Sequence, residues 1–155
     1  MKSTKILLII VILFVMQSCC KDTKEVCSVD ISNSLTSIEK EYSCENTTTN
    51  MHLNSNIEYK VITNSVDYDN LVVGVCHPTI NFTKYNLIIG TIFSDVGINY
   101  LPYKFYSSCE PNYYKLSVNY KIILSQTGNT FYTYHVLVPK EFIIDNLKIT
   151  YLVNS

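Results

Sequence analysis

Apolar and polar residues alternate with a period of two along the C-terminal third of the chain. From residue 114 to residue 124 every second residue is apolar, and those between are mostly Lys, Ser or Asn. A strand with one buried and one solvated face has this pattern. Gly128 and Asn129 form a turn signal, and the alternation resumes from Tyr132 to Val138. The pattern predicts a β-hairpin that ends at Pro139.

Short runs of β-branched and aromatic residues, bounded by Asn, Asp, Gly or Pro, predict further strands. They cover residues 57–63, 71–76, 87–93, 98–106 and 142–153. Pro102 interrupts the fourth run, and a proline within a strand is expected at a sheet edge or a bulge. One short helical turn is expected within residues 34–42, and no longer amphipathic helix is indicated. We therefore predict an all-β fold, an antiparallel β-sandwich of about seven or more strands.

The N-terminal residues have the pattern of an export signal. Lys2 and Lys5 precede an uninterrupted apolar run over residues 6–16, which is too short to span a bilayer. We expect a signal peptide over residues 1–20, cleaved before Lys21, and therefore a secreted protein. No later apolar stretch is long enough for a transmembrane helix.

Two other interpretations of this segment stay open. The first is an uncleaved signal anchor. The second is a bacterial lipoprotein acylated at Cys19, because Gln17, Ser18 and Cys19 end the apolar run and polar residues follow.

Four cysteines follow the predicted signal peptide: Cys27, Cys44, Cys76 and Cys109. An even number behind an export signal predicts two disulfides, and the sequence leaves all three pairings open. No CxxC spacing occurs, so zinc and thioredoxin-type redox sites are not indicated. The predicted organisation is a signal peptide (1–20), a polar N-terminal segment (21–43) and a disulfide-stapled β-sandwich domain (44–155).

Two Asn-x-Thr sequons predict a glycoprotein, with Asn46 and Asn81 as acceptors in polar stretches. Composition and charge narrow the range of expected binding partners. The chain has 12 Lys, no Arg and 13 acidic residues, a formal net charge of −1. This balance gives no electrostatic footprint for a nucleic acid.

The residues that could carry chemistry are few. His135 falls on the polar phase of its predicted strand and is expected to face solvent, while His77 could form a nucleophilic pair with Cys76 only if that thiol were free. Asp67 and Asp69 lack the Gly and Glu of a calcium loop and are expected in a solvated turn. We predict no catalytic residue, metal or cofactor, and no enzymatic activity.

Aromatic residues gather around Cys109 in a segment expected to contain loops. Rigid aromatic side chains with polar tips are typical of binding surfaces. The candidate binding surface comprises Tyr100, Tyr103, Phe105, Tyr106 and Tyr113. The alternative is that about half of these side chains fill the core of the sandwich.

Residues 66–77 read VDYDNLVVGVCH and end in Gly-x-Cys-His. This segment, with the interval from Cys44 to Cys76, resembles the poxvirus immune-evasion (PIE) domain family. The resemblance covers about 65 residues, from Cys44 to Cys109, and the later cysteines of the family are missing. It implies a secreted or ER-retained β-sandwich that captures host immune proteins. The C-terminal residues 152–155 are not a KDEL-type signal, which favours secretion.

Three hypotheses about function follow. The first is a secreted viral immune-evasion protein that sequesters a host chemokine, cytokine or co-stimulatory ligand. The second is a bacterial cell-envelope lipoprotein with a β-sandwich, serving as an adhesin or a structural module. The third is a viral immunoglobulin-like interleukin-18-binding protein, which the absence of Trp and the cysteine spacing disfavour.

Overall fold

The computed structural model of the protein describes residues 27–54 and 57–154. The predicted signal peptide and Cys19 lie outside these residues. The described strands are β1 (Ser28–Asp30), β2 (Met51–Leu53), β3 (Tyr59–Ile62), β4 (Val72–Gly74), β5 (Tyr85–Tyr100), β6 (Lys104–Ser108), β7 (Tyr113–Pro139) and β8 (Asn146–Asn154). The helices are η1 (Ser32–Ser34), α2 (Ile38–Tyr42), α3 (Thr47–Asn50) and α4 (Ser65–Leu71). None of these helices is long and apolar enough to cross a membrane.

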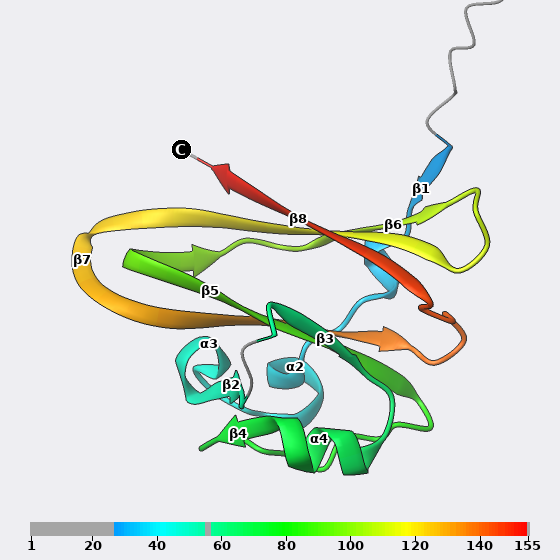
Figure 1. The fold of residues 1–155 in the computed structure, drawn as a ribbon, viewed down its shortest axis with the longest axis horizontal. Coiled ribbons are helices and arrows are strands. Elements are labelled where there is room, and N and C mark those ends of the chain that lie inside the picture. The colour runs from blue at the N-terminus through cyan, green and yellow to red at the C-terminus, as the bar shows by residue number, and fades with distance from the viewer. Residues whose placement is uncertain (1–26, 55–56, 155) are drawn as a thin grey trace, which may run out of the picture.

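One bent sheet supplies both layers of a β-sandwich, as Figure 1 shows. β5 and β7 pair antiparallel from Tyr85 opposite Pro139 to Tyr100 opposite Tyr120, and this ribbon turns back on itself part-way along. The sheet order is β1-β6-β7-β5-β3, and β8 adds to the other edge of β7. We call residues 130–139 of β7, residues 85–94 of β5 and β3 the covered layer. The open layer comprises residues 113–123 of β7, residues 97–100 of β5, β6, β1 and β8.

The predicted hairpin within β7 is wrong. β7 continues through the expected turn at Gly128 and Asn129, and both of its halves pair with β5. The register shifts between Ser94 and Gly97, which inserts extra residues on β7 at the bend. Gly97 allows the close approach of the two strands there, because a Cβ atom would lie 2.8 Å from Gln126 Cβ. A bent strand and a hairpin share the same alternation, so the pattern alone does not separate them.

The alternation predicts part of the core correctly, whereas Ile122 and Leu124 on the same predicted apolar face are 44 and 78 % exposed. Even-numbered residues of β7 line the concave side of the bend in both layers, where Leu116, Val118, Tyr134 and Val136 are buried. They form the core between the layers with Ile88 and Phe105.

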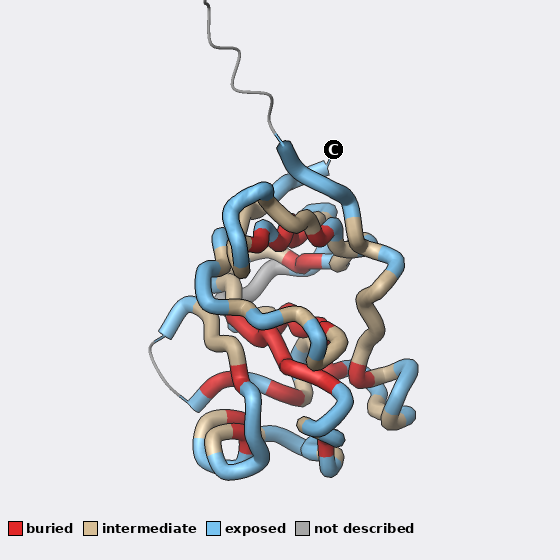
Figure 2. The backbone as a smooth tube through the Cα atoms, turned by 90° about the vertical axis from the view of Figure 1, so that its right-hand side faces the viewer, coloured by how far each residue is buried: buried red, intermediate tan, exposed pale blue. Residues whose placement is uncertain are grey.

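A second core lies between the covered layer and the helices. The helices α2, α3 and α4 lie against the outer face of this layer (Figure 1). Ile38, Tyr68, Leu87, Ile89 and Leu137 belong to this core. In Figure 2 buried segments accordingly lie at more than one level of the molecule.

The remaining strands agree largely with the sequence prediction. Pro102 separates β5 from β6 as expected, and a helix occupies the end of the predicted 34–42 segment, where Ser37 caps it by accepting a hydrogen bond from the Lys40 amide at 3.2 Å. β8 pairs parallel to β7 instead of antiparallel. Because β7 bends back, the chain leaving Pro139 arrives beside Tyr113 and runs along the first half of β7 in the same direction.

The two predicted disulfides are present, and the structure settles their pairing. Cys27 pairs with Cys109 and Cys44 with Cys76, with Cα atoms 5.5 and 5.9 Å apart. The first links β1 to the end of β6, and the second links the helical layer to the segment after β4. The described part of the predicted polar segment, residues 27–43, belongs to the same folded unit, because β1 pairs with β6 and Ile38 is buried.

Candidate functional site

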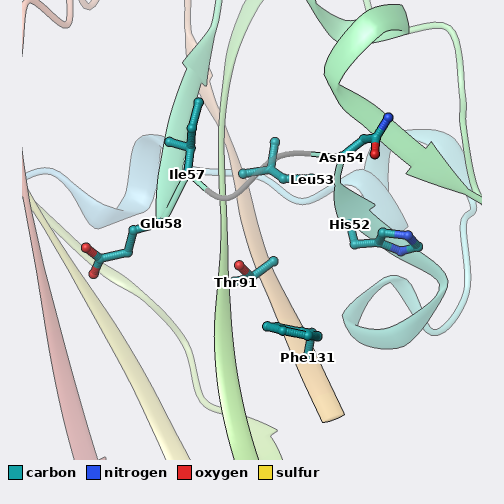
Figure 3. Close-up of a pocket in the computed structure, with 7 residues that line it drawn as sticks. All are labelled: His52, Leu53, Asn54, Ile57, Glu58, Thr91 and Phe131. Atoms are coloured by element: carbon teal, nitrogen blue, oxygen red, sulfur yellow. The ribbon is translucent and has the colours of Figure 1, made fainter.

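A groove of about 840 Å³ opens on the helical side of the covered layer. Figure 3 shows its lining: Thr91 and Phe131 rise from neighbouring strands, with β2 residues on one side and the start of β3 on the other. The full lining is His52, Leu53, Asn54, Ile57, Glu58, Thr91 and Phe131.

The groove exists because the β5–β7 ribbon is longer than the helices that cover it. Along β7, Leu137 and His135 are buried beneath the helices, whereas Phe131 is 62 % exposed. Along β5, Ile89 is buried, whereas Phe93 is 58 % exposed. The floor of the groove is therefore an uncovered continuation of the second core.

Phe93 and Phe131 form an exposed aromatic pair. They face each other across the ribbon, with ring centroids 5.2 Å apart. Each ring already has one side in contact with its neighbour, so a ligand that covers the pair meets a preformed surface. Large, preordered aromatic side chains carry much of the energy of protein interfaces. Ile57, 46 % exposed, extends the apolar surface at the groove wall.

A hydrogen-bonded chain across the sandwich holds one wall of the groove. The Tyr134 and Tyr151 hydroxyls lie 3.0 Å apart, and Tyr151 donates to Glu58 Oε1 at 2.9 Å. Burial raises the pKa of the Tyr151 hydroxyl to about 12. Gly90 makes room for this arrangement, because a Cβ atom there would lie 2.2 Å from the Tyr134 hydroxyl oxygen. Glu58 is therefore anchored from β8 although its side chain lies at the surface.

His135 corrects the prediction of a solvent-facing side chain. It is buried, with Nε2 2.6 Å from Thr47 Oγ1 and 3.1 Å from Glu39 Oε1, because α2 and α3 cover that face of β7. The Thr47 hydroxyl also donates to Glu39. Burial raises the pKa of the Glu39 carboxyl, but the hydrogen bond and charge of His135, with Thr47, outweigh it and lower the pKa to about 2.

This cluster is not arranged for nucleophilic catalysis. In a Ser-His-Asp triad the acid and the nucleophile bind different ring nitrogens. Here both bind Nε2, and His135 Nδ1 has no hydrogen-bond partner within the described residues. The cluster instead joins α2 and α3 to β7.

The other candidate chemical residues are separate. Cys76 is in a disulfide, so it is not a nucleophile for His77, whose ring packs against Tyr68 with centroids 4.4 Å apart. Asp67 and Asp69 lie in α4, which corrects the predicted turn. No cluster of His, Cys, Asp or Glu within the described residues could hold a metal ion.

The predicted aromatic binding surface is divided between core and surface. Phe105 is fully buried and stacks on Tyr114, with centroids 5.3 Å apart, so it is a core residue and not a surface residue. Tyr100 and Tyr103 pack against the core between the layers. Tyr106 and Tyr113 lie on the outer face of the open layer, where they line a smaller hollow. Neighbouring residues on a strand point to opposite faces, which separates Tyr106 from Phe105.

Both predicted glycosylation acceptors are exposed and lie outside the groove. Asn46 precedes α3, and Asn81 precedes β5, where its Oδ1 accepts hydrogen bonds from the Thr83 amide at 3.0 Å and hydroxyl at 2.7 Å. Glycosylation itself stays a prediction.

Comparison with known proteins adds no assignment. No family model, curated protein or solved structure matches this chain. The resemblance of residues 66–77 to the poxvirus family therefore stays an expectation.

Sequence analysis missed Phe93 and Phe131 as surface residues. Phe93 lies in a run predicted as a strand, where the alternation places it on one face with Leu87 and Ile89, and Phe131 lies between the predicted turn and the strand expected from Tyr132. Their exposure depends on where α3 and β2 end over the sheet.

Proposed function

We propose that the protein is a secreted viral immune-evasion protein that binds and sequesters a host immune protein, a chemokine, a cytokine or a co-stimulatory ligand. The observation that carries the proposal is the exposed Phe93–Phe131 pair, of which Phe131 lines the groove beside β2. The export-signal pattern, the two disulfides and the resemblance of residues 66–77 support an extracellular role against a host.

The groove suits a segment of a folded partner. A loop or strand of the ligand would cover the aromatic pair and Ile57, and removal of their apolar surface from water would drive binding. Glu58, held by Tyr151, and the exposed His52 provide polar contacts at the rim. Because Glu58 is already held in place, little side-chain entropy is lost when a ligand pairs with it.

Binding by contact agrees better with these features than catalysis does. Among the described side chains, the cluster of Glu39, Thr47 and His135 has the geometry closest to a catalytic site, and none of the three residues lines the groove. The groove has one carboxylate and one imidazole at its rim, on opposite walls.

The experiment measures capture of a panel of purified host chemokines, cytokines (interleukin-18 included) and co-stimulatory ligands on a sensor surface. We expect the wild-type chain to bind at least one member. The Phe93→Thr/Phe131→Thr variant should lose about a hundredfold in affinity, because truncating two central aromatic contacts removes most of a hot spot. The matched control is Val66→Thr/Val75→Thr, which changes two exposed apolar residues near α4 (67 and 90 % exposed) and should bind normally.

Three results would contradict the proposal. The first is that the wild-type chain binds no member of the panel, and the second is that the Phe93→Thr/Phe131→Thr variant binds as well as the wild type. The third is mass spectrometry of the exported chain that finds an acylated Cys19 instead of an N-terminal Lys21, which would favour the lipoprotein alternative.

A further inference from the structure

The outer face of the open layer places two lysines side by side. Lys115 on β7 is directly opposite Lys148 on β8, and on its other side it is opposite Tyr106 on β6. Like charges directly opposite on neighbouring strands are destabilising. Both lysines are exposed, and no described helix covers this face.

These two charges have no acidic partner among the described residues. The ion pair that the structure shows on this face joins Lys104 to Asp30 at 3.3 Å. Lys115 Nζ lies 5.9 Å from the centroid of the Tyr106 ring, a contact that leaves its charge available.

Protection of a sheet edge does not account for the pair. A lysine on an edge strand such as β8 hinders pairing with other chains, and this could explain Lys148. Lys115, however, lies on a strand that is paired on both sides. Its position next to Lys148 therefore points to an external anion.

The lysines open onto a hollow of about 270 Å³ lined with hydroxyl groups. Besides Lys115 and Lys148, the residues that line the hollow include Ser28, Tyr106, Ser108 and Tyr113. The cationic surface continues beyond the hollow. Lys121 lies six residues beyond Lys115 along the same face of β7, about 20 Å away.

We propose that this face binds a linear polysaccharide that carries sulfate groups. Sulfate esters stay ionised, and one sulfate between Lys115 and Lys148 would relieve their repulsion. Hydroxyl groups that line the hollow, among them those of Ser28, Tyr106 and Tyr113, offer hydrogen-bond partners for sugar hydroxyls. An extended chain matches the spacing of the lysines better than a compact acidic protein surface does.

This inference goes beyond the proposed function and does not depend on it. The lysine face is the outer face of the open layer, whereas the groove lies on the outer face of the covered layer. Both faces can therefore be occupied at once, so the protein can be held on a sulfated surface while it binds a protein ligand.

The test measures binding of the exported chain to immobilised heparin at about 0.15 M salt, where exposed charges interact over about 8 Å. We expect wild-type binding that weakens as salt rises, and an affinity about tenfold lower for Lys115→Gln/Lys148→Gln. The matched control is Lys40→Gln/Lys60→Gln, which removes the same charge from α2 and β3 and should retain wild-type affinity. Circular dichroism and thermal melting establish that each variant is folded.

Three outcomes would overturn the inference. The first is that the wild-type protein does not bind heparin, and the second is that the two lysine variants lose the same amount of heparin affinity. The third is competition by polyglutamate as effective as by heparin at equal charge, which would assign the face to an acidic protein segment. The Phe93→Thr/Phe131→Thr variant should keep its heparin affinity, so failure here is distinguishable from failure of the proposed function.

Discussion

The two layers share the strands β5 and β7, yet their outer faces differ. In the open layer the odd-numbered residues Lys115 and Lys121 of β7 are exposed, as an alternating pattern predicts. In the covered layer the odd-numbered residues His135 and Leu137 are buried, because α2, α3 and α4 lie over them. Alternation therefore locates the inner face of a sandwich, whereas the burial or exposure of the outer face depends on segments distant in sequence.

The largest expected effect comes from loosening the covered layer alone. Replacing Cys44 and Cys76 by Ala removes a cross-link over 32 residues, which we expect to cost about 3–4 kcal/mol of unfolding free energy. Hydrogen exchange should show that α2, α3 and α4 lose protection first, while β6 and β8 keep theirs. Equal loss of protection in both layers would show that the helices and the open layer unfold as one unit.

A smaller effect is expected at the polar link between helices and sheet. The folded-state pKa of Glu39 is lowered from 4.5 to about 2, so its contribution to stability is fully present above about pH 5 and is lost as the pH falls towards 2. Because the Glu39 side chain is 40 % exposed, solvent screening reduces the contribution, and Glu39→Gln should cost about 1–2 kcal/mol at pH 7.

Urea denaturation between pH 7 and pH 3 measures this contribution. The variant should lose less stability than the wild type on acidification, because it lacks the carboxylate that must be protonated. Parallel pH profiles would mean that Glu39 and His135 are not coupled. Glu41→Gln, an exposed position on the same helix, is the control.

The smallest effect is a gain in stability in the open layer. Lys115→Gln removes the repulsion with Lys148, so we expect the melting temperature to rise by about 1 °C at low ionic strength and the difference to vanish in 1 M salt. Thermal melting at both salt concentrations checks this. A lower melting temperature at low salt would mean that contact with Tyr106 outweighs the repulsion.

Local patterns predicted much of the fold. The β-branched runs located β3 and β4, Pro102 marked the break between β5 and β6, and the even cysteine count predicted both disulfides. The turn predicted at Gly128 and Asn129 is wrong because a long strand that bends can contain the same residues. The parallel direction of β8 depends on that bend, and the pairing of the cysteines depends on contacts between segments distant in sequence, so no local pattern indicates them.

The candidate sites were less predictable than the fold. Aromatic content singled out Tyr106 and Tyr113, which line the lysine hollow, but also Phe105, which is buried. Phe93 resembles a core residue in sequence, since it continues the face of Leu87 and Ile89, whereas Phe131 falls, with His135, on the polar phase of its strand. They are exposed because the ribbon extends past the helices, a difference in length between elements far apart in the chain.

The bend in β7 has a consequence for how the polypeptide acquires its shape. Tyr85, at the start of β5, pairs with Pro139, and β8 adds only after that. During synthesis neither layer can be completed until nearly the whole chain has left the ribosome, and pairings this distant in sequence are expected to form slowly.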